Sequence, residues 1–430
     1  PYQKLFWTDM FFALTGAAVT LIIPLIVRYI TNEVVYLEGN EPLHQIIKLG
    51  ILMMGLVAVE FFCNFYIAYY GHLMGAKMEH DMRNEIFSHY QKLSFTFYDN
   101  QKVGQLLSRV TSDLFDISEL LHHGPEDIVI SLIKFIGSFI ILFQINGTLT
   151  LVAYAFIPVM AAYAYYFNKK MKRAFKENRA KIADINSQIE DSLSGIRVVK
   201  SFANEAEEMR KFCEGNERFV RTKRTSYWYM GWFHSGLGAL TTMVTIGVLI
   251  AGAMMLTRGK LVVTDLITFL LYINNFTEPV KKLINFTEQF QNGYSGYERF
   301  LEILDIQPDI KDAPDALPLD RVEGDVEFED VSFGYGEKKE YVLNHINLKV
   351  KAGEYIAIVG ASGGGKTTLC SLIPRFYEVE KGRILLDGTD IRKIKLKDLR
   401  DHIGIVQQDV YLFMENVMEN IRYGRPDATD

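Results

Sequence analysis

Three long stretches of the sequence contain no charged residue: Phe11–Val27, Phe135–Asn168 and Ser235–Thr257. A helix needs roughly 20 mostly apolar residues to cross the ~30 Å hydrocarbon layer of a membrane. Such stretches exclude a purely soluble protein, and all of them lie before about residue 290. The sequence therefore predicts six membrane-spanning helices, at about 10–31, 47–72, 127–146, 148–168, 235–257 and 263–288.

The distribution of Lys and Arg orients these spans. Residues 169–230 carry fifteen Lys and Arg and residues 77–126 carry five, whereas residues 31–45 carry none. Positive charge close to a span stays on the cytoplasmic side, so we expect both termini and both long connections there. Helical periodicity without proline in 78–120 and 171–229 favours spans that continue as helices into the cytoplasm. Two independent soluble insertions are the alternative.

Charge and cysteine content exclude further classes of protein. The formal net charge is −6, and a nucleic-acid-binding protein needs a basic face, so we expect no nucleic-acid partner. Cys63, Cys213 and Cys370 form neither a CxxC pair nor a metal-ligand spacing. A disulfide scaffold is therefore not expected.

Two carboxylates lie inside predicted spans. Glu60 is eleven residues beyond Leu49, which places it ~16 Å along its helix at 1.5 Å per residue. A charge facing lipid there is costly, so Glu60 either contacts substrate or a proton, or makes a hydrogen bond between helices. Lysines follow Glu278 within one turn, and an ion pair is the favoured interpretation there. The candidate residues for lining a cavity that binds a small amphipathic substrate are Glu60, Asn64, Tyr272, Asn275 and Glu278. Ordinary packing between helices is the alternative explanation for these side chains.

The composition changes after Ile306. Residues 307–320 hold three prolines and several aspartates, which is typical of a linker between residues 1–306 and 321–430. Beyond the linker, alternating and apolar runs predict strands at 325–333, 346–350 and 355–359.

The last of these runs leads into a GxxxxGK[ST] motif at Gly360–Thr367, and a helix is predicted from Thr368 to Phe376. Glycines let backbone N–H groups wrap a polyphosphate, Lys366 supplies charge to the β- and γ-phosphates, and the Thr367 hydroxyl can bind Mg²⁺. A glycine-rich turn without a ligand does not explain the lysine. The motif predicts binding of a nucleotide and Mg²⁺ by Gly360, Ser362, Gly363, Gly364, Gly365, Lys366, Thr367 and Thr368.

Residues on both sides of this motif resemble the ATP-binding cassette (ABC) transporter family. Val331–Tyr335 resembles the A-loop, in which Tyr335 would stack on adenine. Ile405–Asp409 resembles the Q-loop, in which Gln408 would reach Mg²⁺ and the attacking water. In the membrane half, Phe97–Gln105 and Ser194–Phe202 resemble the two intracellular loops of ABC exporters, whose tips are short coupling helices.

The resemblance is greatest to bacterial homodimeric multidrug and lipid exporters. It implies an all-α membrane domain of six helices followed by part of an α/β P-loop ATP-binding domain. It also implies a half-transporter in the bacterial cytoplasmic membrane that pairs with a second copy or a homologous half-transporter. A member of the family hydrolyses ATP to export a drug-like compound or a lipid. One half of a heterodimer and a nucleotide-gated protein that does not pump are the alternatives.

The sequence departs from the family pattern at its C-terminal end. It stops at Asp430, soon after the resemblance to the Q-loop, without an LSGGQ segment, a Walker B aspartate, a catalytic glutamate or a switch histidine. We therefore expect the sequence to be a portion of a longer protein, and catalysis of ATP hydrolysis to belong to the complete protein.

Overall fold

The computed structural model describes residues 2–336, 340–407 and 410–429. The chain divides into two compact units, each of which is described by itself. The first combines Pro1–Asn84 with Ser108–Leu301, and the second combines Glu85–Leu107 with Glu302–Asp430. Residues 85–107, which fall within the expected membrane domain in chain order, thus pack with the C-terminal unit.

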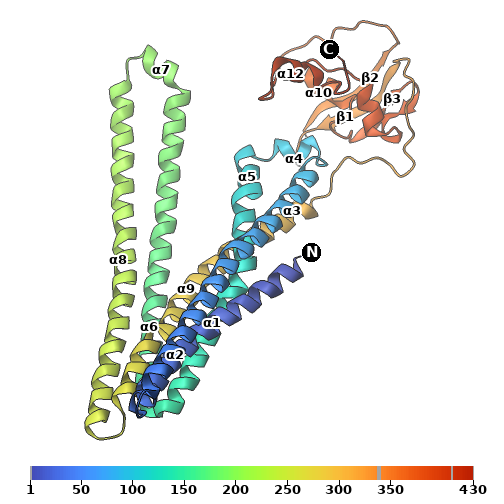
Figure 1. Cartoon of the computed structure of the whole chain (residues 1–430). Coiled ribbons are helices and arrows are strands. Elements are labelled where there is room, and N and C mark those ends of the chain that lie inside the picture. The colour runs from blue at the N-terminus through green and yellow to red at the C-terminus, as the bar shows by residue number, and fades with distance from the viewer. Residues whose placement is uncertain (1, 337–339, 408–409, 430) are drawn as a thin grey trace. The chain divides into compact units, whose positions relative to one another are not determined.

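The first unit is built from helices, which Figure 1 shows in blue to yellow. Its apolar stretches fold as expected because an isolated helix satisfies all of its own backbone hydrogen bonds. In chain order the elements are α1 (Gln3–Asn32), η1 (Val34–Tyr36), α2 (Glu41–Tyr66), η2 (Ile67–Gly71), α3 (His72–Tyr90), η3 (Arg109–Asp113), α6 (Leu114–Ser194), α7 (Ile196–Ser201), α8 (Glu205–Thr257) and α9 (Val263–Asp305).

Four helical stretches among the described residues are long and apolar enough to cross a membrane. One of them, Val103–Ser194, contains two of the predicted spans, 127–146 and 148–168. The backbone leaves helical geometry at Asn146, and this break separates the two spans. The predicted span 263–288 forms the first part of α9 but is not among the four. Asp265, Asn274 and Glu278 lower its apolar character.

The core of the first unit explains how α9 still belongs to the bundle. Phe269 and Phe276 on α9 are fully buried and pack in one cluster with Leu142 of α6 and Val244 of α8. The apolar side chains of α9 thus pack against the neighbouring helices, and α9 belongs to the bundle although it also carries polar side chains. The all-α membrane domain with long helices is confirmed in this arrangement.

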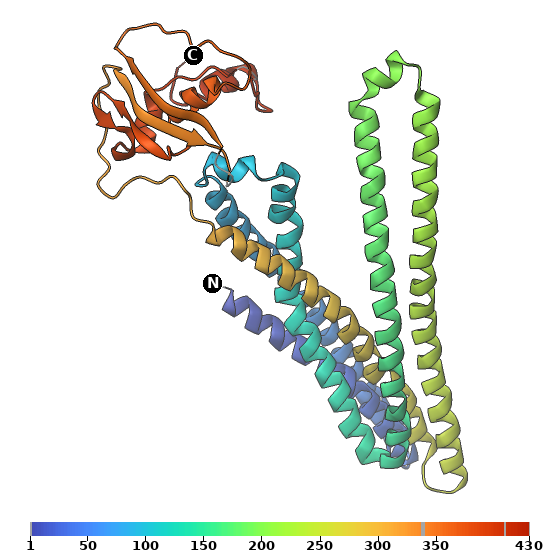
Figure 2. The ribbon, with the colours of Figure 1, turned by 180° about the vertical axis from the view of Figure 1, so that it is seen from behind.

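Beyond the bundle, α6 and α8 extend side by side as a long arm, and the short helix α7 joins their ends (Figures 1 and 2). This arm covers most of the predicted helical region 171–229. Gly195 caps the end of α6 and separates it from α7. The periodicity of the sequence thus correctly predicted helices rather than separate soluble insertions.

The second unit contains a small sheet with short helices; Figure 1 shows the sheet in orange to red and the helices of residues 95–108 in light blue to teal. The sheet is antiparallel, with strand order β2-β1-β3-β4, and Val326 of β1 pairs with Val350 on one side and Leu386 on the other. Its core includes Phe328 and Leu372. The elements are α4 (Phe95–Asp99), α5 (Val103–Ser108), β1 (Val326–Gly334), β2 (Tyr341–Val350), α10 (Lys366–Leu372), β3 (Lys381–Leu386), β4 (Thr389–Asp390), η4 (Ile391–Lys393), α11 (Leu396–Asp401) and α12 (Val417–Arg422).

The predicted strand at 355–359 is wrong for the described part of the chain. These residues have no strand hydrogen-bond partner there, and Tyr355 and Val359 are exposed. A run that is apolar on both faces forms a strand only between neighbouring strands that share its hydrogen bonds and cover its faces. The predicted strands at 325–333 and 346–350 are confirmed within β1 and β2.

Candidate functional site

The GxxxxGK[ST] motif forms an exposed loop that ends at the first residue of α10. Gly363 and Gly365 have φ values of 79° and 80°, which L-residues with a side chain rarely adopt. A Cβ at Gly365 would also lie 2.7 Å from Leu343 Cδ2 and 3.2 Å from the Val342 carbonyl oxygen. The sequence therefore folds locally into a loop that only glycine permits at this position.

The charge of Lys366 is held over this loop. Its Nζ donates to the carbonyl oxygens of Gly360 at 3.0 Å and Ala361 at 2.7 Å. Among the described residues no carboxylate forms a salt bridge with it, so the loop carries a positive charge without a counter-ion from the protein. The hydroxyl-bearing residues Ser362 and Thr367 are exposed beside it. A polyphosphate with a bound cation fits this set of groups.

Tyr335 lies next to the loop although it is far from it in the sequence. Its hydroxyl is hydrogen-bonded to Thr368 Oγ1 at 3.1 Å, and its ring meets that of Phe333 edge-to-face at 4.9 Å. The side chain is 44% exposed, so part of the ring surface is open to a ligand. The structure thus brings the predicted adenine contact and the predicted phosphate loop together. The predicted Mg²⁺ contact, Gln408, lies outside the described residues.

A tyrosine that the sequence did not single out joins this site to α4. Tyr377 OH donates to Asp99 Oδ2 at 2.8 Å, and the ring of Tyr377 meets that of Tyr335 edge-to-face at 5.2 Å. Burial, together with the hydrogen bond to Asp99, raises the pKa of the Tyr377 phenol. The ring of Phe95 also packs on Phe376 at 4.5 Å. The first predicted coupling helix therefore touches the same part of the unit as the adenine-side tyrosine.

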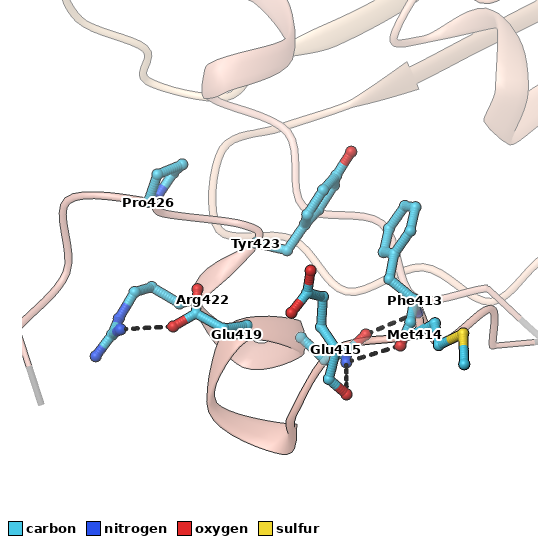
Figure 3. Close-up of a pocket in the computed structure, with 8 residues that line it drawn as sticks. Phe413, Met414, Glu415, Glu419, Arg422, Tyr423 and Pro426 are labelled. Carbon is cyan, nitrogen blue, oxygen red and sulfur yellow. Dashed lines mark hydrogen bonds and ion pairs between the residues drawn. The ribbon is translucent and has the colours of Figure 1, made fainter.

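The segment that follows residue 410 forms a pocket of about 570 Å³ in this unit, apart from the glycine-rich loop (Figure 3). The rings of Phe413 and Tyr423 are stacked 4.6 Å apart on one side of it. Arg422 pairs with Glu419 at 3.0 Å, and the Asn420 side chain ties the turn to the backbone of Phe413. Hydrogen bonds within the segment therefore account for most of its polar groups.

The membrane unit contains a polar cavity of about 330 Å³ between α1, α2, α6 and α9. It brings together three of the predicted cavity residues, Glu60, Asn64 and Glu278. The other two lie elsewhere: the Tyr272 hydroxyl donates to the Leu21 carbonyl, and Asn275 Nδ2 donates to the Thr20 carbonyl at 3.2 Å. These two side chains join α9 to α1 rather than lining the cavity.

The charged groups of the cavity differ from the expected ion pairs. Glu278 pairs with Lys134 of α6 at 3.8 Å rather than with a lysine of its own helix, and Lys282 bonds Asp127 at 2.8 Å. Glu60 has no hydrogen-bond or salt-bridge partner among the described residues. Lys134 was not among the residues predicted for the cavity, although a lysine inside the predicted span 127–146 is the same kind of signal as Glu60.

Comparisons with known proteins agree with these features. The model of the ABC transporter transmembrane region matches residues 6–280, and the ABC transporter model matches residues 343–429. The uncharacterized ABC transporter ATP-binding protein YwjA of Bacillus subtilis (strain 168) is 40% identical over 430 residues, which cover 100% of this chain and 74% of that protein. YgaD of the same organism, an ATP-binding/permease protein named for multidrug export, is 31% identical over 434 residues, with coverage of 100% and 74%.

A solved structure shares the fold. The structure of a bacterial Atm1-family ABC exporter with ATP bound superposes with a TM-score of 0.80 at 22% identity, covering 100% of this chain and 76% of that one. The helical membrane unit, the glycine-rich loop and the two matching family models all lead to the same assignment. The chain belongs to the ABC transporter family and has the architecture of a half-transporter, with a membrane domain that precedes an ATP-binding domain.

Proposed function

We propose that this chain is part of an ATP-driven exporter that moves a hydrophobic or amphipathic compound, a drug-like molecule or a lipid, across the bacterial cytoplasmic membrane. The complete protein works as a dimer of two such chains, with the ATP-binding domains and both termini in the cytoplasm. The observation that carries this proposal is the pair of sites on one chain: a polar cavity inside an apolar bundle and an uncompensated lysine over a glycine loop.

The ATP site would use the groups described above. The backbone N–H groups of Gly363–Lys366 would hold the phosphates, and Lys366 would neutralise charge on the β- and γ-phosphates. Thr367 would supply a hydroxyl ligand to Mg²⁺, and Tyr335 would stack on adenine. Bound ATP supplies the free energy that biases the transporter between two conformations.

The cavity favours substrates that are largely apolar and carry positive charge. Glu278 is already paired with Lys134, whereas Glu60 has no such partner among the described residues. An unpaired carboxylate in a membrane is costly, and a cationic amphiphile would lower that cost by supplying the counter-charge. Glu60 is therefore the group in the cavity that we expect to contact substrate.

Replacing Lys366 tests the proposal. In inside-out vesicles that contain the complete protein, Lys366→Ala should abolish ATP-dependent uptake of a fluorescent dye or labelled lipid, because the phosphates lose their main counter-charge. Lys351→Ala, an exposed lysine of the same unit, is the matched control and should transport normally. Undiminished uptake by Lys366→Ala would contradict the proposal. ATP-gated current without uptake against a gradient would indicate the non-pumping alternative.

A further inference from the structure

Three histidines and a glutamate converge where α3 lies beside α6. His72 is the first residue of α3, and Glu119, His122 and His123 occupy one stretch of α6. One potential ligand atom from each residue lies within 4.8 Å of all the others. His122 is buried, and none of the four takes part in the ATP site or in the Lys134–Glu278 pair.

The two histidines of α6 are held with one ring nitrogen toward this cluster. His122 Nδ1 is 2.6 Å from the Ser118 carbonyl oxygen, which can only accept, so Nδ1 carries the proton. His123 Nδ1 is 3.3 Å from Glu126 Oε2. A histidine that donates one N–H to a carbonyl or carboxylate presents its other nitrogen as a lone pair, which is the arrangement found around bound metals. In both rings the remaining nitrogen is Nε2, which faces Glu119.

The distances between these atoms suit a tetrahedral site. His122 Nε2 lies 3.2 Å from His72 Nδ1 and 3.9 Å from Glu119 Oε1, and His123 Nε2 lies 3.9 Å from Glu119 Oε2. Zinc–nitrogen bonds of 2.0–2.1 Å in tetrahedral geometry require ligand atoms about 3.3 Å apart. The widest separation in the cluster is 4.8 Å, so side-chain rotations that bring the ligand atoms closer by up to about 1.5 Å would complete the site. Three imidazoles and one carboxylate are ligands typical of zinc and its transition-metal neighbours.

The helix packing keeps this geometry in place. Gly75 is three residues beyond His72 on the same face of α3, and a Cβ there would lie 2.8 Å from both His122 Nδ1 and Ser118 Oγ. Only glycine lets α3 approach α6 this closely. The ligands are thus carried by two helices whose contact is fixed, and not by a loop.

The surroundings of the cluster favour a cation. Asp9 is 1% exposed, and neither of its carboxylate oxygens has a hydrogen-bond partner among the described residues. Glu126 is also buried and already accepts from His123. A divalent ion would compensate the charge of these carboxylates. Cavities of about 330 Å³ and 680 Å³ reach His123 from two sides and give an ion access.

We propose that His72, Glu119, His122 and His123 form a binding site for a divalent transition metal of the zinc class, which joins α3 to α6. The site is separate from the proposed ATP site, whereas His72 and His123 also line the 330 Å³ cavity that contains Glu60. Its test does not depend on transport. A bound ion would be held by one bond from α3 and three from α6, and would stabilise the membrane unit.

Metal content of the full chain in lipid nanodiscs tests the site. After treatment with a chelator and dialysis against Zn²⁺, the wild-type chain should retain one zinc per chain by elemental analysis. His72→Ala and Glu119→Gln should each weaken zinc binding by about 100-fold or more. This is a larger effect than the loss of a side chain that only hydrogen-bonds to a metal ligand. His80→Ala, an exposed histidine on the same helix, is the matched control and should bind as the wild type does.

Two further readouts distinguish a built site from adventitious binding. Co²⁺ should give the visible spectrum of a tetrahedral site in the wild-type chain and lose it in His72→Ala. Zinc should raise the melting temperature of the wild-type chain and leave that of His72→Ala, an exposed position, unchanged. Equal zinc content in the wild type and in a His72→Ala/Glu119→Gln variant, or loss of zinc on His80→Ala alone, would overturn the proposal.

Discussion

At the scale of single residues, the most informative groups are charged side chains for which the described residues supply no partner of opposite charge. Within the described parts of the chain, Lys366 bonds only to carbonyl oxygens of its own loop, and the buried Asp9 carboxylate has no hydrogen-bond partner. Each arrangement costs free energy that a ligand of opposite charge would recover. A motif search finds Lys366, whereas the position of Asp9 depends on the fold and is invisible in the sequence.

Gly365→Ala should impair the phosphate loop. A φ of 80° costs an L-residue about 1–2 kcal/mol, and the new Cβ would also press on Leu343. We expect ATP affinity to fall by more than about 10-fold, since the loop would shift to relieve the contact, with 1.4 kcal/mol corresponding to a factor of about ten. Binding of a fluorescent ATP analogue and thermal unfolding would measure both effects.

Gly404→Ala is the control for that change. Gly404 belongs to the same unit, has no positive φ, and a Cβ there would meet no atom within 4 Å. It should therefore bind ATP and unfold as the wild type does. If both variants bind the ATP analogue with wild-type affinity, the argument from the left-handed glycine does not hold.

At the scale of elements, α4 and the ATP site form one contact network. Asp99 of α4 accepts from Tyr377, whose ring meets Tyr335, whose hydroxyl in turn reaches Thr368 at the start of α10. These residues are up to 278 positions apart in the chain, so that their contact depends on tertiary structure alone. The network offers a direct physical route between a helix of the first intracellular loop and the nucleotide loop.

Tyr377→Phe removes the hydrogen bond to Asp99 and keeps the ring contacts. The free energy of unfolding should fall by about 0.5–1.5 kcal/mol, the usual net value of one hydrogen bond. A double-mutant cycle with Asp99→Ala should return a coupling of similar size. Tyr341→Phe, whose hydroxyl has no partner among the described residues, should change little. A coupling energy of zero would show that the Tyr377–Asp99 bond does not form in solution.

Elements were easier to predict from the sequence than their contacts. The uncharged runs and the helical periodicity predicted the spans and the α6–α8 arm, because a helix satisfies its own backbone. The strand at 355–359 was wrong, because a strand needs neighbours that the local sequence does not reveal. The same limit hid the His72 cluster: forty-six residues and two helices separate His72 from Glu119. Only the fold shows that they meet.

At the scale of the whole molecule, transport is coupled to ATP hydrolysis if a substitution in the membrane cavity changes how substrates stimulate the ATPase activity. Glu60→Gln changes a residue of the membrane unit, whereas the glycine-rich nucleotide loop belongs to the other unit. A ligand shifts a conformational equilibrium only by its difference in affinity for the two states. A change in the stimulation of ATPase activity by one class of compound and not by another therefore indicates substrate contact.

Glu60→Gln should lower the apparent affinity of cationic amphiphiles as stimulators of that ATPase activity. Loss of one counter-charge in a membrane cavity should raise the half-maximal concentration by about 10-fold, equivalent to 1.4 kcal/mol. Neutral amphiphiles should be unaffected. Glu41→Gln, at the other end of α2, is the matched control. An unchanged response to a panel of cationic compounds would remove Glu60 from the substrate site.

The division into units also sets an order of events during synthesis. Residues 85–107 complete their packing only with partners that begin at Glu302, after 108–301 have been made and placed in the first unit. At 5–20 residues per second, this delay is roughly 10–40 s. Throughout it, the aromatic surface of Phe95 lacks Phe376 and stays open to the ribosome-exit environment. Chaperone capture of the nascent chain should therefore concentrate on this short, early segment.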